Sequence, residues 1–467
     1  MMSQTYNFSN VVKTGIQKRW SYFLYTLCVL LALPMIGQTQ INKEYYSLKS
    51  ALKHPKQVLA ISTNIQELHT HAQRLGELSN LKQLILHNQT EKPSPKTLPS
   101  QIGLLKQLRT LNIRENKLTH LPKEIGQLNK LESLDLQHNK LTTLPVEIGN
   151  LKALTHLYLN KNELISLPKE IGQLRQLKYL YLEFNQLQTL PEEIGQLQHL
   201  KELLLQYNQL TSLPKQIGQL SQLTKLNLGY NKLASLPTEI GKLIQLTNLP
   251  LPYNKLASLP KEIGQLKKLT QIDLRNNQLS SLPKEIGDLI NLKRLFLNYN
   301  QLTTLPNNIG KLVNLKRLWL SNNQIKNLPQ EVGLLKSLTT LNLMGNRLIK
   351  LPKTIYQLEN LINLRLGDNK ITLLSDQIGH LKQLQTLNLQ NNQLSQLPKA
   401  IGQLKALTSL TLIRNQLTTL PKEIGQLSQL KDLYVGYNRL SSVPEEIRHL
   451  KNLQELIIGK GNSLTKG

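Results

Sequence analysis

Residues 121–141 read L-P-K-E-I-G-Q-L-N-K-L-E-S-L-D-L-Q-H-N-K-L, and this stretch decides the fold. Leu134 and Leu136 alternate with polar residues, which is the period of a short strand with one buried face. The proline before K-E-I-G-Q suits the start of a short helical or 3-10 segment, where a missing N–H has no partner to lose. The stretch therefore predicts one short strand followed or preceded by one short helical turn.

The same unit recurs every 23 residues along most of the chain, as the positions of its proline and its asparagine show. The prolines are Pro99, Pro122, Pro145, Pro168, Pro191, Pro214, Pro237, Pro260, Pro283, Pro306, Pro329, Pro352, Pro398, Pro421 and Pro444, with Ser375 in the one gap. The asparagines are Asn116, Asn139, Asn162, Asn185, Asn208, Asn231, Asn254, Asn277, Asn300, Asn323, Asn346, Asn369, Asn392, Asn415 and Asn438. A unit this short cannot bury a core alone, so neighbouring units must stack.

The pattern L-x-x-L-x-L-x-x-N joined to L-P-x-x-I-G-x-L resembles the leucine-rich repeat family, in the 23-residue class found in secreted bacterial proteins and in intracellular scaffolds of the Ras-suppressor type. The resemblance covers about residues 81–458. It implies an α/β solenoid shaped as a horseshoe, with a parallel β-sheet on the concave side and short helical or 3-10 segments on the convex side. We expect the recurrent asparagine to satisfy the backbone of a buried turn and to bind no ligand.

Residues 1–40 differ from the rest of the chain and predict a signal peptide or an N-terminal anchor. Basic residues precede an apolar run from Ser21 to Ile36, and no acidic residue occurs before Glu44. Such a run is short for a bilayer span, and the basic end is expected to stay inside, so either outcome places the repeats outside the cytoplasm. Cys28, the single cysteine, lies within the run without the preceding small residue of a lipoprotein site. We therefore expect a secreted, cell-surface or periplasmic protein.

The repeats are expected to end in two caps. Residues 41–80 read as an N-terminal cap with one degenerate repeat, in which Leu59, Ile61 and Asn64 keep the spacing; residues 81–445 are the repeats and residues 446–467 a C-terminal cap. Glu91–Lys96 reads as an inserted loop. A metal site in the N-terminal cap is a weaker alternative to solvated polar side chains, and its candidate ligands are His54, His69, His71 and His87.

The aromatic residues indicate a binding face. Aromatic residues are 4% of the chain, and after residue 80 all but Tyr356 fall on positions that point outward from the predicted strands. These are Tyr158, Tyr179, Tyr181, Phe184, Tyr207, Tyr230, Tyr253, Phe296, Tyr299, Trp319, Tyr434 and Tyr437. Exposed rings are enriched among the residues that dominate binding energies. The alternative is a ladder of rings that only stiffens neighbouring turns, which suits Tyr207, Tyr230 and Tyr253.

Charge limits the kind of partner. The net charge is +28, yet the outward strand positions are nearly neutral. Their basic residues are Arg114, Lys161, Lys225, Arg275, Arg294, Arg317, Arg365, Arg414 and Lys460, and their acidic residues are Glu115, Asp135, Glu183, Glu202, Asp273, Asp368, Asp432 and Glu455. A nucleic-acid groove needs dense positive charge, so specific nucleic-acid binding is not expected; the outer Lys coat suits solubility or loose association with anionic surfaces. Arg294 and Arg317 beside Phe296 and Trp319 form a local basic and aromatic cluster, suited to stacking and carboxylate capture.

Two further features complete the expectations. Pro250 and Pro252 remove two N–H groups from one side of a strand, which predicts a local weakening between repeats. The sequence has no phosphate loop, no G-x-S-x-G and no H-E-x-x-H, so no enzyme and no cofactor is expected. The favoured function is an exported interaction solenoid whose concave aromatic face binds a protein or glycan, with adhesion to host or matrix components implied by the resemblance; the alternative is an intracellular signalling scaffold.

Overall fold

A computed structural model describes residues 44–87, 95–459 and 461–462, which all belong to one compact unit, Glu44–Gly467. The predicted leader, residues 1–40, and most of the predicted inserted loop lie outside the described residues. The hydrophobic core of the described residues lies inside this unit, which carries the repeats.

Within the described residues, nineteen short strands form one parallel sheet, in which each strand pairs with the next along the chain. They are β1 (Glu44–Tyr45), β2 (Ala60–Asn64), β3 (Gln83–His87), β4 (Thr110–Asn112), β5 (Ser133–Asp135), β6 (His156–Tyr158), β7 (Tyr179–Tyr181), β8 (Glu202–Leu204), β9 (Lys225–Asn227), β10 (Asn248–Pro250), β11 (Gln271–Asp273), β12 (Arg294–Phe296), β13 (Arg317–Trp319), β14 (Thr340–Asn342), β15 (Asn363–Arg365), β16 (Thr386–Asn388), β17 (Ser409–Thr411), β18 (Asp432–Tyr434) and β19 (Glu455–Ile457). From β4 onward, paired residues are one repeat apart.

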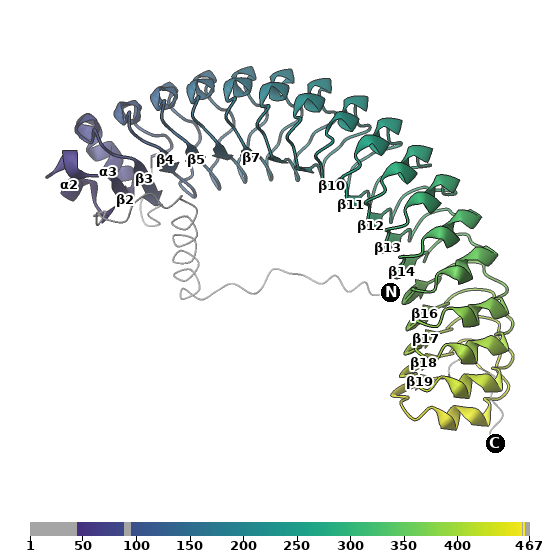
Figure 1. Cartoon of the computed structure of the whole chain (residues 1–467). Coiled ribbons are helices and arrows are strands. Elements are labelled where there is room, and N and C mark those ends of the chain that lie inside the picture. Colours follow the sequence, from purple (N-terminus) through teal and green to yellow (C-terminus); the bar gives the residue numbers. More distant parts are fainter. Residues whose placement is uncertain (1–43, 88–94, 460, 463–467) are drawn as a thin grey trace, which may run out of the picture. The chain divides into compact units, whose positions relative to one another are not determined.

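In the same described ranges the return segments are 3-10 turns, apart from two short helices near the start of the unit, α2 (Leu48–Ala51) and α3 (Ile65–Thr70). The 3-10 turns are η1 (Pro55–Gln57), η2 (Ala72–Glu77), η3 (Ser100–Leu104), η4 (Lys123–Gln127), η5 (Val146–Asn150), η6 (Lys169–Gln173), η7 (Glu192–Gln196), η8 (Lys215–Gln219), η9 (Thr238–Lys242), η10 (Lys261–Gln265), η11 (Lys284–Asp288), η12 (Asn307–Lys311), η13 (Gln330–Leu334), η14 (Lys353–Gln357), η15 (Asp376–His380), η16 (Lys399–Gln403), η17 (Lys422–Gln426) and η18 (Glu445–His449). Figure 1 shows the strands on the inner, concave side of the repeat unit and the coiled segments on its outer side. The predicted leucine-rich repeat solenoid is confirmed.

The repeat proline differs slightly from its expected place. Pro122 precedes the first residue of η4 and has extended backbone angles, φ −70° and ψ 149°. The other repeats keep this arrangement. The proline therefore fixes the entry of the chain into each 3-10 turn and is not part of its first helical residues.

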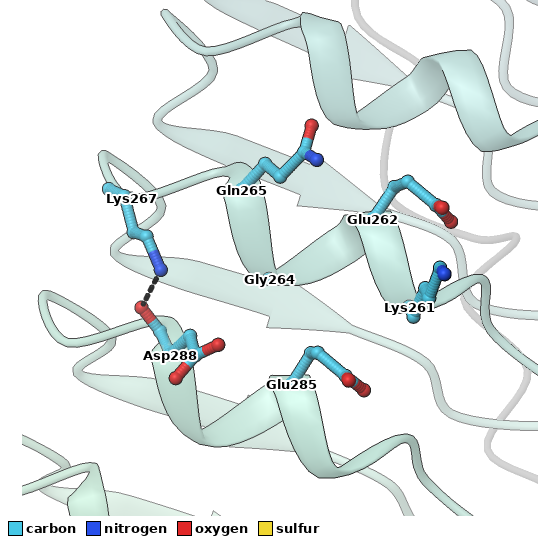
Figure 2. A pocket seen from close by; sticks show the side chains of 7 residues that line it. All are labelled: Lys261, Glu262, Gly264, Gln265, Lys267, Glu285 and Asp288. Carbon is cyan, nitrogen blue, oxygen red and sulfur yellow. Dashed lines mark hydrogen bonds between the residues drawn. The ribbon is translucent and has the colours of Figure 1, made fainter.

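The 3-10 turns of neighbouring repeats pack so closely that glycine is needed between them. A Cβ added at Gly264 in η10 would lie 2.6 Å from the carbonyl oxygen of Glu285 in η11 (Figure 2). No side chain fits at that distance unless the backbone moves. The repeat I-G pair thus sets the spacing on the convex side, where the isoleucine is buried and the glycine permits contact.

The core is a continuous stack of leucine and isoleucine. Within one repeat, Leu131, Leu134, Leu136 and Ile148 are fully buried, and the same positions are buried in the repeats on either side. Because each repeat contributes the same slots, burial is shared between neighbours and does not depend on any single unit. This explains why so few aromatic residues are required inside.

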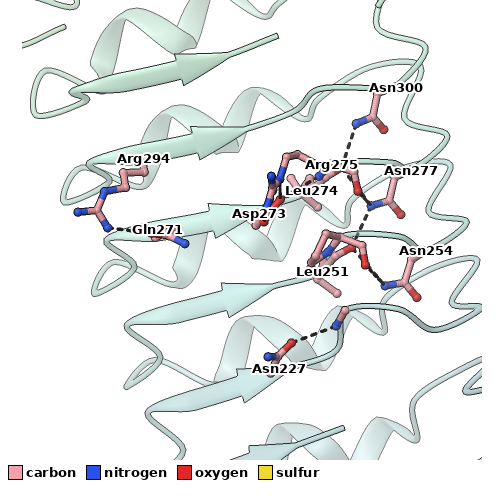
Figure 3. Close-up of polar contacts among 12 residues, drawn as sticks. Asn227, Leu251, Asn254, Gln271, Asp273, Leu274, Arg275, Asn277, Arg294 and Asn300 are labelled. Carbon is pink, nitrogen blue, oxygen red and sulfur yellow. Dashed lines mark hydrogen bonds and ion pairs between the residues drawn. The ribbon is translucent and has the colours of Figure 1, made fainter. Parts of the chain in front are cut away.

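The recurrent asparagine forms a buried ladder, as expected. Asn254 donates from its amide nitrogen to the carbonyl oxygen of Leu228, in the preceding repeat, at 2.9 Å. It also donates to the carbonyl oxygen of Leu251 at 3.2 Å (Figure 3). Its amide oxygen accepts the N–H of Leu233 at 3.0 Å. All three contacts satisfy buried backbone groups and use both N–H donors of the amide, which is the structural role expected for this asparagine.

At both ends of the repeats the asparagine ladder differs from what the 23-residue spacing predicts. Asn64 keeps the spacing but instead caps α3, because its side chain accepts the N–H of Glu67 at 2.8 Å. At the other end Asn462, one place late, accepts the N–H of Leu440 at 3.0 Å and continues the ladder. The degenerate N-terminal repeat thus keeps its strand but not its asparagine turn.

Candidate interaction face

The residue before each ladder asparagine has left-handed backbone angles. In the regular repeats its φ lies between +51° and +65°. These residues are Glu115, His138, Lys161, Phe184, Tyr207, Tyr230, Tyr253, Asn276, Tyr299, Asn322, Gly345, Asp368, Asn391, Arg414 and Tyr437. Glycine and asparagine tolerate this region, whereas a bulky side chain costs roughly 1–2 kcal/mol there. Contacts made by an aromatic side chain at this position can offset part of that cost.

Four consecutive repeats supply such contacts by stacking their rings. Phe184, Tyr207, Tyr230 and Tyr253, here called the aromatic column, lie with ring centroids 4.3, 4.1 and 4.4 Å apart and interplanar angles of 8°, 14° and 14°. The ammonium of Lys161 lies 5.8 Å from the Phe184 centroid at the start of the column. The ladder of rings, the alternative interpretation of Tyr207, Tyr230 and Tyr253, is therefore present, and it includes Phe184 as well.

The aromatic column remains open to solvent along its length. Its side chains are between 38% and 46% exposed. Burial and the neighbouring hydroxyls of Tyr207 and Tyr253 raise the pKa of Tyr230 to about 12. The Tyr230 phenol therefore stays protonated, and the column presents hydroxyl groups and ring edges to solvent.

A second group of rings lies within the strands. Here called the tyrosine cluster, it consists of His156 and Tyr158 from β6 with Tyr179 and Tyr181 from β7. His156 stacks on Tyr179 with centroids 4.7 Å apart, and Tyr158 meets Tyr181 edge-to-face at 5.2 Å. All four side chains are partly exposed.

Hydrogen bonding and burial fix the state of this cluster. The Tyr181 hydroxyl donates to a carboxylate oxygen of Glu202 at 3.1 Å, and the Lys225 ammonium lies 3.4 Å from the same oxygen. Burial, and then the charge of Glu202, raise the pKa of Tyr181 well above its usual range. Burial also lowers the pKa of His156. Tyr181 and His156 are thus neutral near neutral pH, and the Glu202–Lys225 ion pair lies beside them.

A third group, the Phe–Trp pair, comprises Phe296 of β12 and Trp319 of β13. Their rings meet edge-to-face with centroids 5.2 Å apart and an interplanar angle of 73°. Both are partly exposed, and among the described residues the indole N–H of Trp319 has no hydrogen-bond partner. The pair presents an apolar surface two residues beyond Arg294 and Arg317 on the same strands.

The arginines around this pair do not behave alike. The Arg275 guanidinium lies 5.5 Å from the Phe296 centroid and is held by Asp273, with N–O distances of 2.9 and 2.6 Å (Figure 3). Arg294 donates to the side-chain oxygen of Gln271 at 3.0 Å. The ring-stacked cation is therefore Arg275, which sequence reasoning placed on this face but not in the cluster.

The remaining predicted aromatic residues lie apart from these groups. Tyr299 is exposed in the turn after β12. The equivalent left-handed positions of the two neighbouring repeats hold Asn276 and Asn322, so Tyr299 has no ring to stack on there. Tyr434 donates to Glu455 at 2.6 Å near the last strand, and Arg414 lies 5.4 Å from the Tyr437 centroid. The single predicted aromatic strip thus resolves into three separate ring groups and a few isolated rings.

Of the residues that sequence reasoning missed, His156 is the clearest. It was not counted among the aromatic residues, yet its ring contacts both Tyr158 and Tyr179. Its position, two residues before Tyr158 on the exposed side of the strand, is the signal that could have found it. Lys460, counted among the basic residues of this face, lies outside the described residues.

The described residues offer no other evident site. No group of three or more His, Cys, Asp or Glu side chains among them could hold a metal ion. His69 instead bonds the carbonyl oxygen of Thr97 at 2.8 Å, and His87 bonds the hydroxyl of Ser62 at 2.5 Å. The depression between η10 and η11 that Figure 2 shows is lined by Gly264 and by Lys, Glu, Gln and Asp side chains that are at least partly exposed. Within the described ranges no helix has the length and hydropathy needed to cross a bilayer.

Comparison with known proteins identifies relatives of the repeat. A model of the leucine-rich repeat region matches residues 54–162, 166–251, 234–323, 306–389 and 373–466. No curated protein matches the chain. A solved leucine-rich repeat protein of Leptospira interrogans is 42% identical, with 89% of this chain and 100% of that chain covered and a TM-score of 0.65.

Two other solved structures show how widely this fold is used. The ectodomain of an Arabidopsis thaliana membrane receptor kinase, in complex with Casparian strip integrity factor 2, is 31% identical over 87% of this chain, with a TM-score of 0.68; this chain spans 52% of its length. An internalin of Listeria monocytogenes, 24% identical over 70% of this chain and 87% of its own, with a TM-score of 0.52, shares the fold. Such solenoids are typical of protein-interaction domains, and the family is typically non-enzymatic. On these matches the chain belongs to the leucine-rich repeat family.

Proposed function

We propose that this protein is an exported, non-enzymatic interaction solenoid that binds a protein partner on its concave aromatic face. The observation that carries the proposal is the exposure of mid-strand rings in edge-to-face pairs, Tyr158 with Tyr181 and Phe296 with Trp319. A core built from leucine and isoleucine has no need of these rings. Partly exposed aromatic side chains on a rigid sheet are the residues most enriched in binding hot spots.

A protein partner is favoured over a glycan by the geometry of the aromatic column. Between Phe184 and Tyr253, each ring face is covered by the next ring. A sugar that stacks on an aromatic side chain needs an open ring face, whereas ring edges and hydroxyls suit peptide groups and apolar side chains. The receptor ectodomain with its bound factor gives a precedent for a peptide or protein on such a solenoid. Host or matrix adhesion remains part of the proposal.

Binding assays can test the face. Immobilised matrix proteins and a glycan array would be probed with the chain and with a variant carrying Tyr181→Ala, Phe296→Ala and Trp319→Ala. Tyr434→Ala with Tyr437→Ala is the matched control, because it removes rings from the same concave side near the last strands, away from the tyrosine cluster and the Phe–Trp pair. We expect the triple variant alone to lose binding. Unchanged binding by a folded triple variant would move the site elsewhere.

Export is supported by the basic and apolar character of residues 1–40. Cell fractionation of the producing organism, with an antibody against the repeats, tests it. The chain should be found outside the cytoplasm. Recovery of the full-length chain in the cytosol would instead favour the intracellular scaffold.

A further inference from the structure

The Phe–Trp pair lies in a stretch of the repeats that carries basic residues and no acidic ones. From Leu289 to Gln330 the sequence contains no Asp or Glu. The same stretch contains the basic residues Lys293, Arg294, Lys311, Lys316, Arg317 and Lys326. Of these six residues only Arg294 and Arg317 occupy outward strand positions, where basic and acidic residues otherwise nearly balance. The other four belong to the general Lys coat.

Two of these residues are placed directly opposite each other. Arg294 of β12 pairs in register with Arg317 of β13, and both side chains are exposed. Adjacent strands lie about 4.8 Å apart, and like charges directly opposite on neighbouring strands are destabilising. The arrangement therefore carries a cost in the free chain.

No carboxylate in the described part of the chain forms an ion pair with Arg294 or Arg317. The repeat before them shows what such a pair would look like, because Arg275 binds Asp273 through two nitrogen atoms. Arg294 and Arg317 have the same planar guanidinium groups but no comparable anion.

We propose that Arg294 and Arg317 together bind a carboxylate side chain from an extended, acidic segment of a protein partner, and that an apolar side chain of the segment packs on the Phe–Trp pair. This inference rests on the proposed function of the concave face. Guanidinium groups match a carboxylate in plane and donate two hydrogen bonds at once. Phe296 and Trp319 follow two residues later on the same strands, so one short segment reaches both features.

The limited extent of the positive charge favours a peptide over a sulfated glycan. On the strand before, the matching positions hold Gln271 and Asp273, and on the strand after they hold Thr340 and Asn342. The concave basic surface is thus two strands wide. A long polyanion gains its affinity from many separate charge contacts, which this surface does not offer.

Intrinsic fluorescence reports on the site directly. The chain has two tryptophans, Trp20 and Trp319, so full-length protein with Trp20→Phe retains only the one in the proposed site. The probe is a synthetic peptide of alternating Glu and Val, with a matched Gln and Val peptide and a heparin oligosaccharide as comparisons. Calorimetry on the same samples gives affinities for each variant.

We expect the Glu peptide to change Trp319 fluorescence and the Gln peptide to leave it unchanged. Arg294→Gln and Arg317→Gln should each weaken binding by about tenfold, and Arg→Lys at either position should restore only part of it, because a lysine cannot form the two-point contact. Arg365→Gln, which removes the same charge from an exposed site two strands beyond β13, is the control and should bind normally. Thermal melting should show that neither Gln variant loses stability, since each removes a repulsion.

Three results would overturn the inference: equal binding of the Gln peptide, unchanged affinity in the double Gln variant, or tighter binding of the heparin oligosaccharide that displaces the Glu peptide. The inference can also fail while the proposed function stands. A partner found in the matrix assay that is lost with the Tyr181, Phe296 and Trp319 variant but kept with the double Gln variant would leave the concave face as the binding site and remove only the role of the arginines.

Discussion

The hydroxyl of Tyr356 accepts a hydrogen bond from the backbone N–H of Ser375 at 3.4 Å. Tyr356 stands where the regular repeats have the glycine of the 3-10 turn, and Ser375 stands where they have the proline that precedes the next turn. A proline at 375 would have no N–H to donate. The two irregularities are therefore one local arrangement, in which the buried Tyr356 side chain occupies the space between η14 and η15 that close packing fills elsewhere.

This arrangement predicts a graded loss of stability. Tyr356→Phe removes one long hydrogen bond and should cost at most about 1 kcal/mol, whereas Tyr356→Ala leaves a cavity and should cost about 3 kcal/mol or more. Urea unfolding of both variants measures the difference. If Tyr356→Ala proves as stable as Tyr356→Phe, the ring does not support this junction.

The left-handed turn before the ladder asparagine predicts an unusual order of substitutions at Tyr230. Tyr230→Gly loses the ring contacts but relieves the backbone strain, while Tyr230→Ala loses the contacts and keeps the strain. The Gly variant should therefore be more stable than the Ala variant by about 1 kcal/mol. Chemical denaturation of the two proteins decides it, and a more stable Ala variant would contradict the assigned backbone.

Pro250, the last residue of β10, and Pro252, which follows the strand, have unequal effects. β10 pairs with β11 at three residue pairs but with β9 only at Asn248 and Lys225. At the positions equivalent to Pro252 in the two neighbouring repeats, Gly229 and Arg275 donate their backbone N–H to a side chain of their own repeat. The missing N–H of Pro252 therefore removes no hydrogen bond between strands. The expected loss of two ladder donors is thus corrected to the one at Pro250.

Hydrogen exchange can test whether this shortened pairing weakens the junction. Amides at the boundary between β9 and β10 should exchange faster than those between β11 and β12. Pro250→Asn, which places there the residue found at Asn227, should slow the exchange. Uniform protection over residues 225–275 in the unaltered chain would show that the junction is as stable as its neighbours.

Glu67 predicts that the N-terminal cap is sensitive to acid. Burial alone would raise its pKa, but hydrogen bonds from Thr63, Ser47 and the backbone N–H groups of Leu48 and Lys49 together lower it. A lowered pKa means that the carboxylate stabilises the cap above its ordinary titration range and that this support is lost as the pH falls through the folded-state value. Limited proteolysis near α2 should therefore increase at low pH, and Glu67→Gln should show the same increase already at neutral pH. A cap equally resistant at both pH values would exclude this role.

The repeat frame, the parallel sheet and the asparagine ladder could be predicted from the sequence because each depends on residues that recur at a fixed interval. Asn254 and its equivalents bond the same backbone groups in every regular unit, so one explanation serves for all. The ring groups could not be predicted in the same way. Whether Tyr207 stacks on its neighbours or Tyr158 meets Tyr181 edge-to-face depends on turn angles and rotamers, which the spacing does not encode.

Features that join two irregular positions were also beyond the sequence. Tyr356 and Ser375 each look like an isolated exception until the structure brings them within hydrogen-bond distance. The N-cap role of Asn64 is similar, because it depends on a helix that replaces the usual turn. The repeated residues predict the regular part of the fold, whereas the roles of these irregular residues can be assigned only from their contacts in the structure.

Footprinting of the complex with its partner tests the central claim most directly. Hydroxyl-radical labelling followed by mass spectrometry would compare the oxidation of Tyr158, Tyr181, Phe296 and Trp319 in the free and bound protein, with Tyr434 and Tyr437 as internal references. The account predicts protection of the first four side chains on binding and little change at the two references. Protection confined to the convex 3-10 turns, with these four rings as reactive as in the free protein, would contradict it.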